Sequence, residues 1–268
     1  MRHGDWSRWK RLRRQAGEVS LFSDPRFAET VAETLEAPVR GFGVFEDAGR
    51  NRRGDDASAE RDTESEPNAV PVAGVLVYER RRGPFRTAGL PPYCPHTPLL
   101  LRSPYSEADA HYRRTPVGPL LEALAATYDA VRLDLAPGFG DVRPFDWSGW
   151  RARPLYTYRA PVGGGEEQIG TWSGSTRRTY QNEQSAFTLE REEVPPATLV
   201  DLCAASYERH GRRLPGPGRE ALTRVLTRLR ELGLARVIGL RRRETGAIEA
   251  GAGLLLGEER AYYWLGGS

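Results

Sequence analysis

The sequence predicts a mixed α/β protein of two units, each with a mixed, largely antiparallel central sheet and flanking helices. Short apolar segments of strand length alternate with segments whose apolar residues recur at helical spacing. The order of these segments in the first half of the chain partly recurs in the second half. The 268 residues suffice for two domains of ordinary size. We expect the units to span residues 1–150 and 151–268.

Two helices open the first unit. The first runs from Asp5 to Gln15, where two tryptophans and a leucine are spaced for one apolar face. The second runs from Pro25 to Leu35, because Asp24 is a favourable N-cap and proline is favoured at the first helical position.

A sheet is expected after these helices. Val39 to Phe45 alternates as a strand does, and Val70 to Glu79 resumes the alternation. Between them, residues 47–69 hold no aromatic or branched aliphatic side chain and carry mixed charges, which predicts a disordered insertion. The rest of the unit is expected to comprise Phe85 to Leu90, a proline-rich turn from Pro91 to Pro98, Leu99 to Leu101, a helix from Pro116 to Tyr128 and a strand from Ala130 to Leu135.

The second unit is expected to begin with a strand from Arg153 to Ala160. The elements that follow are short helices at Glu166–Trp172 and Ser175–Ser185, a strand at Phe187–Glu192, and helices at Pro195–His210 and Gly218–Leu232. Three strands end the chain, at Ala235–Arg242, Ile248–Leu256 and Arg260–Leu265. We expect the last of these strands at an open sheet edge.

Composition excludes several function classes. The longest apolar runs are strand-sized, well short of the roughly 20 residues of a membrane span, and no secretory signal is seen, so we expect a cytoplasmic protein. Lys10 is the only lysine, and no phosphate-binding GxxxxGK[ST] loop is present. Cys94 and Cys203 form no close metal-ligand pair, so we expect no metal site. A net charge of +3 is too small to indicate nucleic-acid binding by itself.

Several short motifs resemble one known family. The motif residues are Leu21 to Pro25 (LFSDP), Tyr156-Thr157-Tyr158, Trp172 with Ser175, Arg177 and Arg178, Tyr207 with His210 to Arg212, Gly246 to Gly253, and Ala261 to Ser268 (AYYWLGGS). Together they resemble the double-GNAT acyltransferases, namely the Fem-type aminoacyltransferases of peptidoglycan bridge synthesis and the acetyltransferase-like proteins of polysaccharide gene clusters. Tyr180, Gln181 and Asn182 stand where that family usually has Ile, Arg and Lys.

The resemblance implies two GNAT-like units and acyl transfer to an amine. The second unit would lack its C-terminal part, so a C-terminally truncated chain is expected. The implied donor is acetyl-CoA or aminoacyl-tRNA, and the implied acceptor is a small molecule or an envelope precursor. The Arg/Gln-x-x-Gly-x-Gly/Ala loop of CoA-using relatives is absent, which favours aminoacyl transfer or no catalysis. The competing interpretations are a non-catalytic remnant or accessory protein that keeps the fold, and a basic RNA-binding protein, with tRNA among its partners.

Nine residues are candidates for the site. For catalysis they are Tyr207, His210 and Tyr263. For substrate binding they are Tyr93, His96, Arg177, Arg178, Tyr180 and Trp264.

Each candidate also has a structural explanation. The two arginines either grip a phosphate at a helix N-terminus or are a solvated pair. His96 is either a ligand contact or an ordinary polar residue of a turn. His210 either acts on substrate or complements a helix C-terminus. Because Tyr263 and Trp264 alternate on a strand, one is expected in the core and the other at a substrate cleft.

Overall fold

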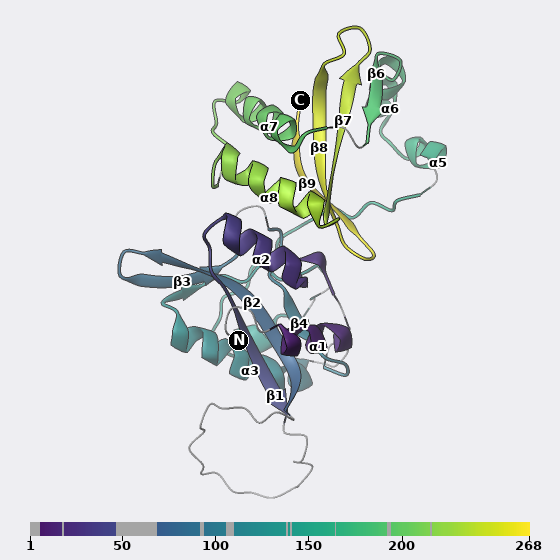
Figure 1. The fold of residues 1–268 in the computed structure, drawn as a ribbon. Helices are drawn as coiled ribbons and strands as arrows, with labels where there is room; N and C mark the ends of the chain where they lie inside the picture. The colour runs from purple at the N-terminus through teal and green to yellow at the C-terminus, as the bar shows by residue number, and fades with distance from the viewer. Residues whose placement is uncertain are drawn as a thin grey trace, which may run out of the picture. The chain divides into compact units, whose positions relative to one another are not determined.

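The chain forms two compact units, each with its own sheet (Figure 1). The computed structural model describes residues 6–17, 19–46, 69–91, 94–105, 110–137, 139, 141–163, 165–191, 194–214 and 216–268. Unit 1 spans Met1–Arg153 and unit 2 spans Pro154–Ser268. The predicted class, mixed α/β with two largely antiparallel sheets and flanking helices, is confirmed. That both units are GNAT-like domains, the second incomplete, stays a prediction. All but one residue of the predicted insertion at 47–69 lies outside the described residues.

The sheet of unit 1 is organised around one long strand. Its strands are β1 (Val39–Glu46), β2 (Val70–Arg82), β3 (Phe85–Gly89), β4 (Leu99–Leu101) and β5 (Ala130–Val131). β1 pairs with β2 along one edge, while β4 and β3 pair with different halves of its other edge. β5 then pairs with β3, and this pair alone is parallel among the described strands. Residues 90–98 therefore interrupt what would otherwise be one continuous strand beside β2.

Helices cover both faces of this sheet. They are α1 (Ser7–Gln15), the 3-10 turn η1 (Leu21–Ser23), α2 (Pro25–Thr34), α3 (Ala110–Thr127) and the short α4 (Arg143–Asp146). Leu120 and Leu124 of α3 are buried in one cluster with Val75 of β2. α1 packs on the opposite face, because a Cβ on the neighbouring Gly74 would lie 2.9 Å from Leu12 Cδ2.

α3 begins six residues earlier than predicted. Pro116 and Pro119 lie inside it, although proline usually begins or breaks a helix. The buried side chains Val117, Leu120 and Leu121 come from the turns that contain these prolines, so tertiary packing outweighs the local preference.

Unit 2 has an antiparallel sheet with two helices on one face. Its elements are α5 (Gly165–Gly170), α6 (Gly174–Glu183), β6 (Phe187–Glu190), α7 (Pro196–Arg209), α8 (Arg219–Glu231), β7 (Ala235–Arg242), β8 (Ile248–Leu256) and β9 (Ala261–Gly267). The strand order is β6-β7-β8-β9, so β9 lies at a sheet edge as predicted. A Cβ on Gly253 would contact Leu199 of α7 and Leu226 of α8, which places both helices over the same face.

The predicted strand at Arg153–Ala160 is wrong. Residues 150–163 have no regular structure, and Tyr156 and Tyr158 are 92% and 100% exposed. The alternation of the segment suits a strand, but a strand needs a neighbour to accept its hydrogen bonds, and this segment has none within the described chain.

Within the part of the chain that the structure describes, no helix is both long enough and apolar enough to cross a membrane.

Candidate functional site

Two motifs of unit 1 meet at a buried histidine. His96, from the proline-rich turn, is 5% exposed, and its ring packs edge-on against Phe22 of LFSDP at 4.6 Å between centroids. The next residue, Thr97, donates its N–H to the Asp134 carbonyl (2.6 Å) and accepts from the Asp134 N–H through its hydroxyl (3.0 Å). The turn is thus tied to the segment that follows β5. Tyr93, the other candidate here, lies outside the described residues.

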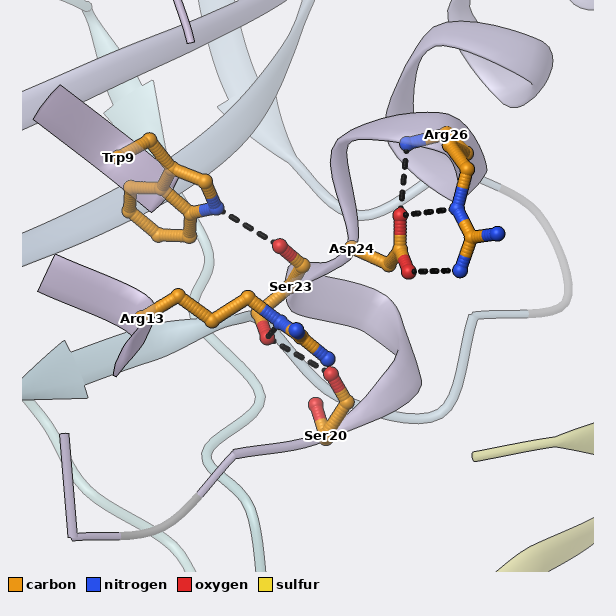
Figure 2. A network of polar contacts seen from close by, with 6 residues as sticks. All are labelled: Trp9, Arg13, Ser20, Ser23, Asp24 and Arg26. Carbon is orange, nitrogen blue, oxygen red and sulfur yellow. Dashed lines mark hydrogen bonds and ion pairs between the residues drawn. The ribbon is translucent and has the colours of Figure 1, made fainter. Parts of the chain in front are cut away.

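A polar network fixes the LFSDP motif beneath α1 (Figure 2). The Trp9 indole N–H donates to the Ser23 carbonyl (2.7 Å), and the Arg13 Nε donates to the Ser23 hydroxyl (3.2 Å). That hydroxyl in turn donates to the carbonyl of Ser20 (2.7 Å). Because Ser23 is fully buried, these bonds satisfy groups that would otherwise be costly to bury. The motif is therefore a rigid support for Phe22 and hence for His96.

Asp24 begins α2 as the sequence predicts. Its carboxylate accepts the Arg26 backbone N–H (2.9 Å) and two bonds from the Arg26 guanidinium (3.1 and 2.7 Å) (Figure 2). Burial raises the pKa of Asp24, but the bonds from Arg26 outweigh it and hold the pKa below its ordinary value. Asp24 is thus an ionised helix cap and has no proton to give at neutral pH.

Unlike Asp24, the Cys94 thiol of the proline-rich turn and the Tyr78 phenol are not ionised at neutral pH. Burial raises the pKa of the Cys94 thiol, and burial followed by the neighbouring Cys94 raises that of Tyr78 well above its ordinary value. Both groups stay protonated at neutral pH, and a protonated thiol is a poor nucleophile and a poor metal ligand. Cys94 therefore offers no thiolate for catalysis or metal binding at neutral pH.

In unit 2, four candidates come from two elements that pack together. Tyr207 and His210 lie at the C-terminal end of α7, and Tyr263 and Trp264 lie on β9. A Cβ on Gly267 would collide with the α7 backbone at Leu202 and Cys203, so only glycine permits this approach. The Arg209 guanidinium also donates to the carbonyl of Ser268.

A β-bulge changes which side chain of β9 reaches the core. Tyr263 pairs with Leu254 and Leu265 pairs with Gly253, so Trp264 is the extra residue. Leu265 is 5% exposed, whereas Tyr263 is 72% exposed and its ring lies over the backbone of Gly266. The sequence predicts that either Tyr263 or Trp264 is buried in the core. Leu265 is buried there instead, because the bulge at Trp264 changes which side chains of β9 point to the core.

The other candidates of unit 2 lie near the opposite edge of the sheet. Arg177, Arg178 and Tyr180 belong to α6, which directly precedes the edge strand β6. Tyr180 packs edge-on against Trp172 at 5.5 Å, and Ser173 caps the helix by accepting the N–H of Thr176 (3.2 Å). Neither α5 nor α6 has a buried residue. The structure therefore separates these three side chains from Tyr263 and Trp264 by the width of the sheet.

One polar cluster in unit 1 is missed by the sequence analysis. The Tyr128 hydroxyl donates to Glu79 Oε1 (2.5 Å), and the guanidiniums of Arg40 and Arg86 lie 3.5 and 3.6 Å from the same oxygen. The Arg86 guanidinium also lies over the Tyr128 ring, 5.5 Å from its centre. These residues come from β1, β2, β3 and the end of α3, so only strand register could have brought them together.

The comparisons with known proteins show the fold. No protein-family model and no curated protein matches the chain. The structure is similar to the crystal structure of FemX, with a TM-score of 0.62 and 12% sequence identity. The similarity covers 100% of this chain and 80% of that chain. The two-sheet α/β architecture is therefore one that a solved protein also adopts.

Proposed function

We propose that the chain is an acyl- or aminoacyltransferase of the GNAT superfamily that acts on an amine in cell-envelope or polysaccharide metabolism. The observation that carries the proposal is the FemX-like fold, which extends over the whole chain. FemX bears the name of the Fem-type family that the motifs resemble, so fold and sequence motifs favour the same class.

The proposed reaction is an acyl transfer. The lone pair of a neutral amine attacks the carbonyl carbon of a thioester or ester donor, and a tetrahedral oxyanion forms. As the C–N amide bond is completed, the C–S or C–O bond breaks, the leaving group keeps that electron pair, and the amine proton passes to a base. Such a site needs a group that takes the proton and N–H donors aimed at the oxyanion.

The α7–β9 region of unit 2 suits this chemistry. We assign proton transfer to Tyr207, His210 or Tyr263, because they lie on the two packed elements beside a sheet edge. We assign acceptor contact to Trp264, since it stands at the bulge of that edge strand. β9 has no second partner strand in the described chain, and its backbone is the proposed source of the oxyanion donors, apart from Gly266, whose N–H contacts the Cys203 thiol.

The remaining candidates are assigned to substrate binding. Arg177 and Arg178 would contact phosphate groups of the donor or acceptor, because the planar guanidinium binds phosphate through two hydrogen bonds. Tyr180 would stack beside them, and Tyr93 and His96 are proposed separately to bind substrate within unit 1. The donor is acetyl-CoA or aminoacyl-tRNA.

An assay with labelled donors tests the proposal. The full chain would be incubated with radiolabelled acetyl-CoA or aminoacyl-tRNA and a panel of amine-bearing envelope precursors and small amines, and labelled amide product would be measured. We expect product from one donor class and a loss of about 100-fold or more in kcat for His210→Ala or Tyr263→Phe if that residue transfers the proton. Tyr156→Phe, at a residue 92% exposed outside both sheets, is the matched control. Failure of both donors with every acceptor would refute the proposal.

A second candidate is a non-catalytic accessory protein that keeps the fold. Asn182 stands where the resembling family has lysine, and the pyrophosphate loop is absent. Calorimetry with the same donors separates the two candidates. Absence of both binding and transfer of either donor supports the accessory protein, because its donor site would be lost, and transfer excludes it.

A further inference from the structure

The β2–β3 hairpin concentrates the positive charge of unit 1 at an exposed tip. Residues 79–87 hold four arginines and one glutamate, a net charge of +3, which equals that of the entire chain. Arg80 through Arg86 are all exposed, and the hairpin extends outward from unit 1 in Figure 1. These nine residues therefore account for the whole net charge, and the positive and negative charges of the rest of the chain cancel.

The register places like charges against each other. Arg81 lies directly opposite Arg86, an arrangement that destabilises a strand pair. Arg86 has the carboxylate of Glu79 nearby, but Arg80, Arg81 and Arg82 form no ion pair with any described residue. Arg81 shares one face of the hairpin with Arg86, and Arg80 and Arg82 share the other. An anionic partner would relieve the repulsion between guanidiniums on each face.

An aromatic ring is exposed among these arginines. Phe85 is 58% exposed and lies directly opposite Arg82, and the Arg80–Thr87 pair lies on the same face of the hairpin. The turn between the strands includes Gly83, whose φ of +60° favours glycine. One hairpin face therefore presents a flat apolar ring beside two guanidiniums.

We propose that the β2–β3 hairpin binds single-stranded RNA. Arginine binds phosphate oxygens through two parallel hydrogen bonds, and an exposed aromatic ring is a stacking surface for any base. A membrane partner is less well matched, because Phe85 is the one large apolar side chain of the tip and anchoring needs more apolar area. The hairpin alone carries this proposal, which holds whether or not the chain transfers acyl groups.

Fluorescence anisotropy with a labelled 12-residue oligouridine tests it. We expect the full chain to bind with an affinity that falls as salt rises, and a log–log slope of about −2 for three phosphate contacts. Replacing Arg80, Arg81 and Arg82 together by Gln should weaken binding about tenfold or more and flatten that slope. Phe85→Ala should weaken binding about tenfold with the slope unchanged, because it removes stacking and no charge.

A matched variant controls for overall charge. Arg212, Arg236 and Arg243 are exposed in unit 2, and replacing them by Gln removes the same three charges. We expect this control to bind RNA nearly as the unaltered chain does, and neither triple variant to have a lower thermal midpoint. Equal loss in the two triple variants would overturn the proposal. So would the absence of binding by the unaltered chain, including the case in which it binds only vesicles of anionic phospholipid.

Discussion

The two units each carry an Arg-Arg-Arg run at a β-hairpin, and the two runs have different surroundings. In unit 2, Arg241 contacts Glu190 of β6 (3.0 Å), and Arg242 makes a two-bond pair with Glu249 of β8 (2.5 and 2.7 Å). In unit 1, the corresponding run at Arg80–Arg82 faces Thr87, Arg86 and Phe85. Two arginines of the run are thus held by carboxylates in the second hairpin, and within the described chain none is in the first.

This comparison indicates that the neighbouring strands, and not the run itself, determine whether the arginines form ion pairs. Glu190 and Glu249 reach the second run because β6 and β8 flank β7 on both sides. Where such partners exist, the charges help to hold the sheet together. Where they do not, the charges are available to an external anion.

The sheets behind the hairpins differ as well. Unit 1 has helices on both faces of its sheet. In unit 2, α7 and α8 cover one face, and the other carries Leu189, Leu240 and Tyr263, each more than one third exposed. The first sheet therefore depends more on buried apolar contacts.

The largest effect should come from the covering layer of unit 1. Leu124→Ala, at a fully buried position of α3, should lower the free energy of unfolding by about 2–5 kcal/mol through the cavity it leaves. The same change at Leu240, 38% exposed on the open face of unit 2, should cost roughly 1 kcal/mol or less. Urea unfolding followed by circular dichroism measures both. Equal losses would mean that the two sheets are covered alike.

The next largest effect concerns Glu79, the carboxylate that lies close to Arg40 and Arg86 in unit 1. Tyr128→Phe removes the hydroxyl that Glu79 accepts and should cost about 1–2 kcal/mol. Burial, followed by the bond to Glu79, raises the pKa of Tyr128 above its ordinary value, so the folded state holds this proton more tightly than the unfolded chain. Its contribution is complete below about pH 10 and is lost as pH rises above it.

Thermal melts between pH 8 and 11 test whether the contribution of Tyr128 to stability falls as pH rises. The unaltered chain should lose stability with rising pH more steeply than Tyr128→Phe. An identical slope in the two would contradict the linkage, and Tyr156→Phe, at an exposed ring, should leave the slope unchanged.

A smaller effect is expected when the first hairpin is made to resemble the second. Arg81→Glu places a carboxylate opposite Arg86 and should stabilise the strand pair by a few tenths of a kcal/mol. It should also weaken RNA binding and reduce the log–log salt slope by about 0.7 or more, the share of one phosphate contact. A rise in the thermal midpoint with RNA affinity unchanged would show that Arg81 is not part of the binding surface.

The smallest effect is expected at Glu249. The hydrogen bonds from Arg242 lower its pKa below the ordinary 4.5, so its contribution is present above pH 4.5 and is lost as pH falls through the lower folded value. Glu249→Gln should therefore reduce the thermal midpoint slightly at pH 7, by an amount that shrinks as pH falls below 4.5. Exposed Glu258→Gln is the control, and an equal change in both variants would argue against a specific pair.

The sequence predicts those parts of the fold that local chemistry determines. α2 begins at Pro25 because Asp24 caps it, and β7 and β8 have the predicted bounds because branched apolar residues end at turns. The start of α3 escapes prediction, since Pro116 and Pro119 imitate a helix start and only buried packing shows otherwise.

The candidate site is less predictable, because it depends on register. Nothing local in AYYWLGGS indicates that Trp264 is the bulged residue or that Leu265 is the buried one. The opposition of Arg81 and Arg86 likewise follows from the two-residue turn at Gly83 and Pro84, which sets the pairing. His96 could be named from its turn, but its contact with Phe22 joins segments about 70 residues apart and is visible only in three dimensions.

The pairing of β3 with β5 also has a consequence for how fast the chain acquires its structure. This parallel contact joins Thr87 to Ala130 and must wait until the intervening chain, with all of α3, has been arranged. In unit 2, β7, β8 and β9 follow one another directly, so each hairpin closes over a few residues. The C-terminal unit should therefore gain its sheet sooner after dilution from denaturant, even though the ribosome releases the N-terminal unit first.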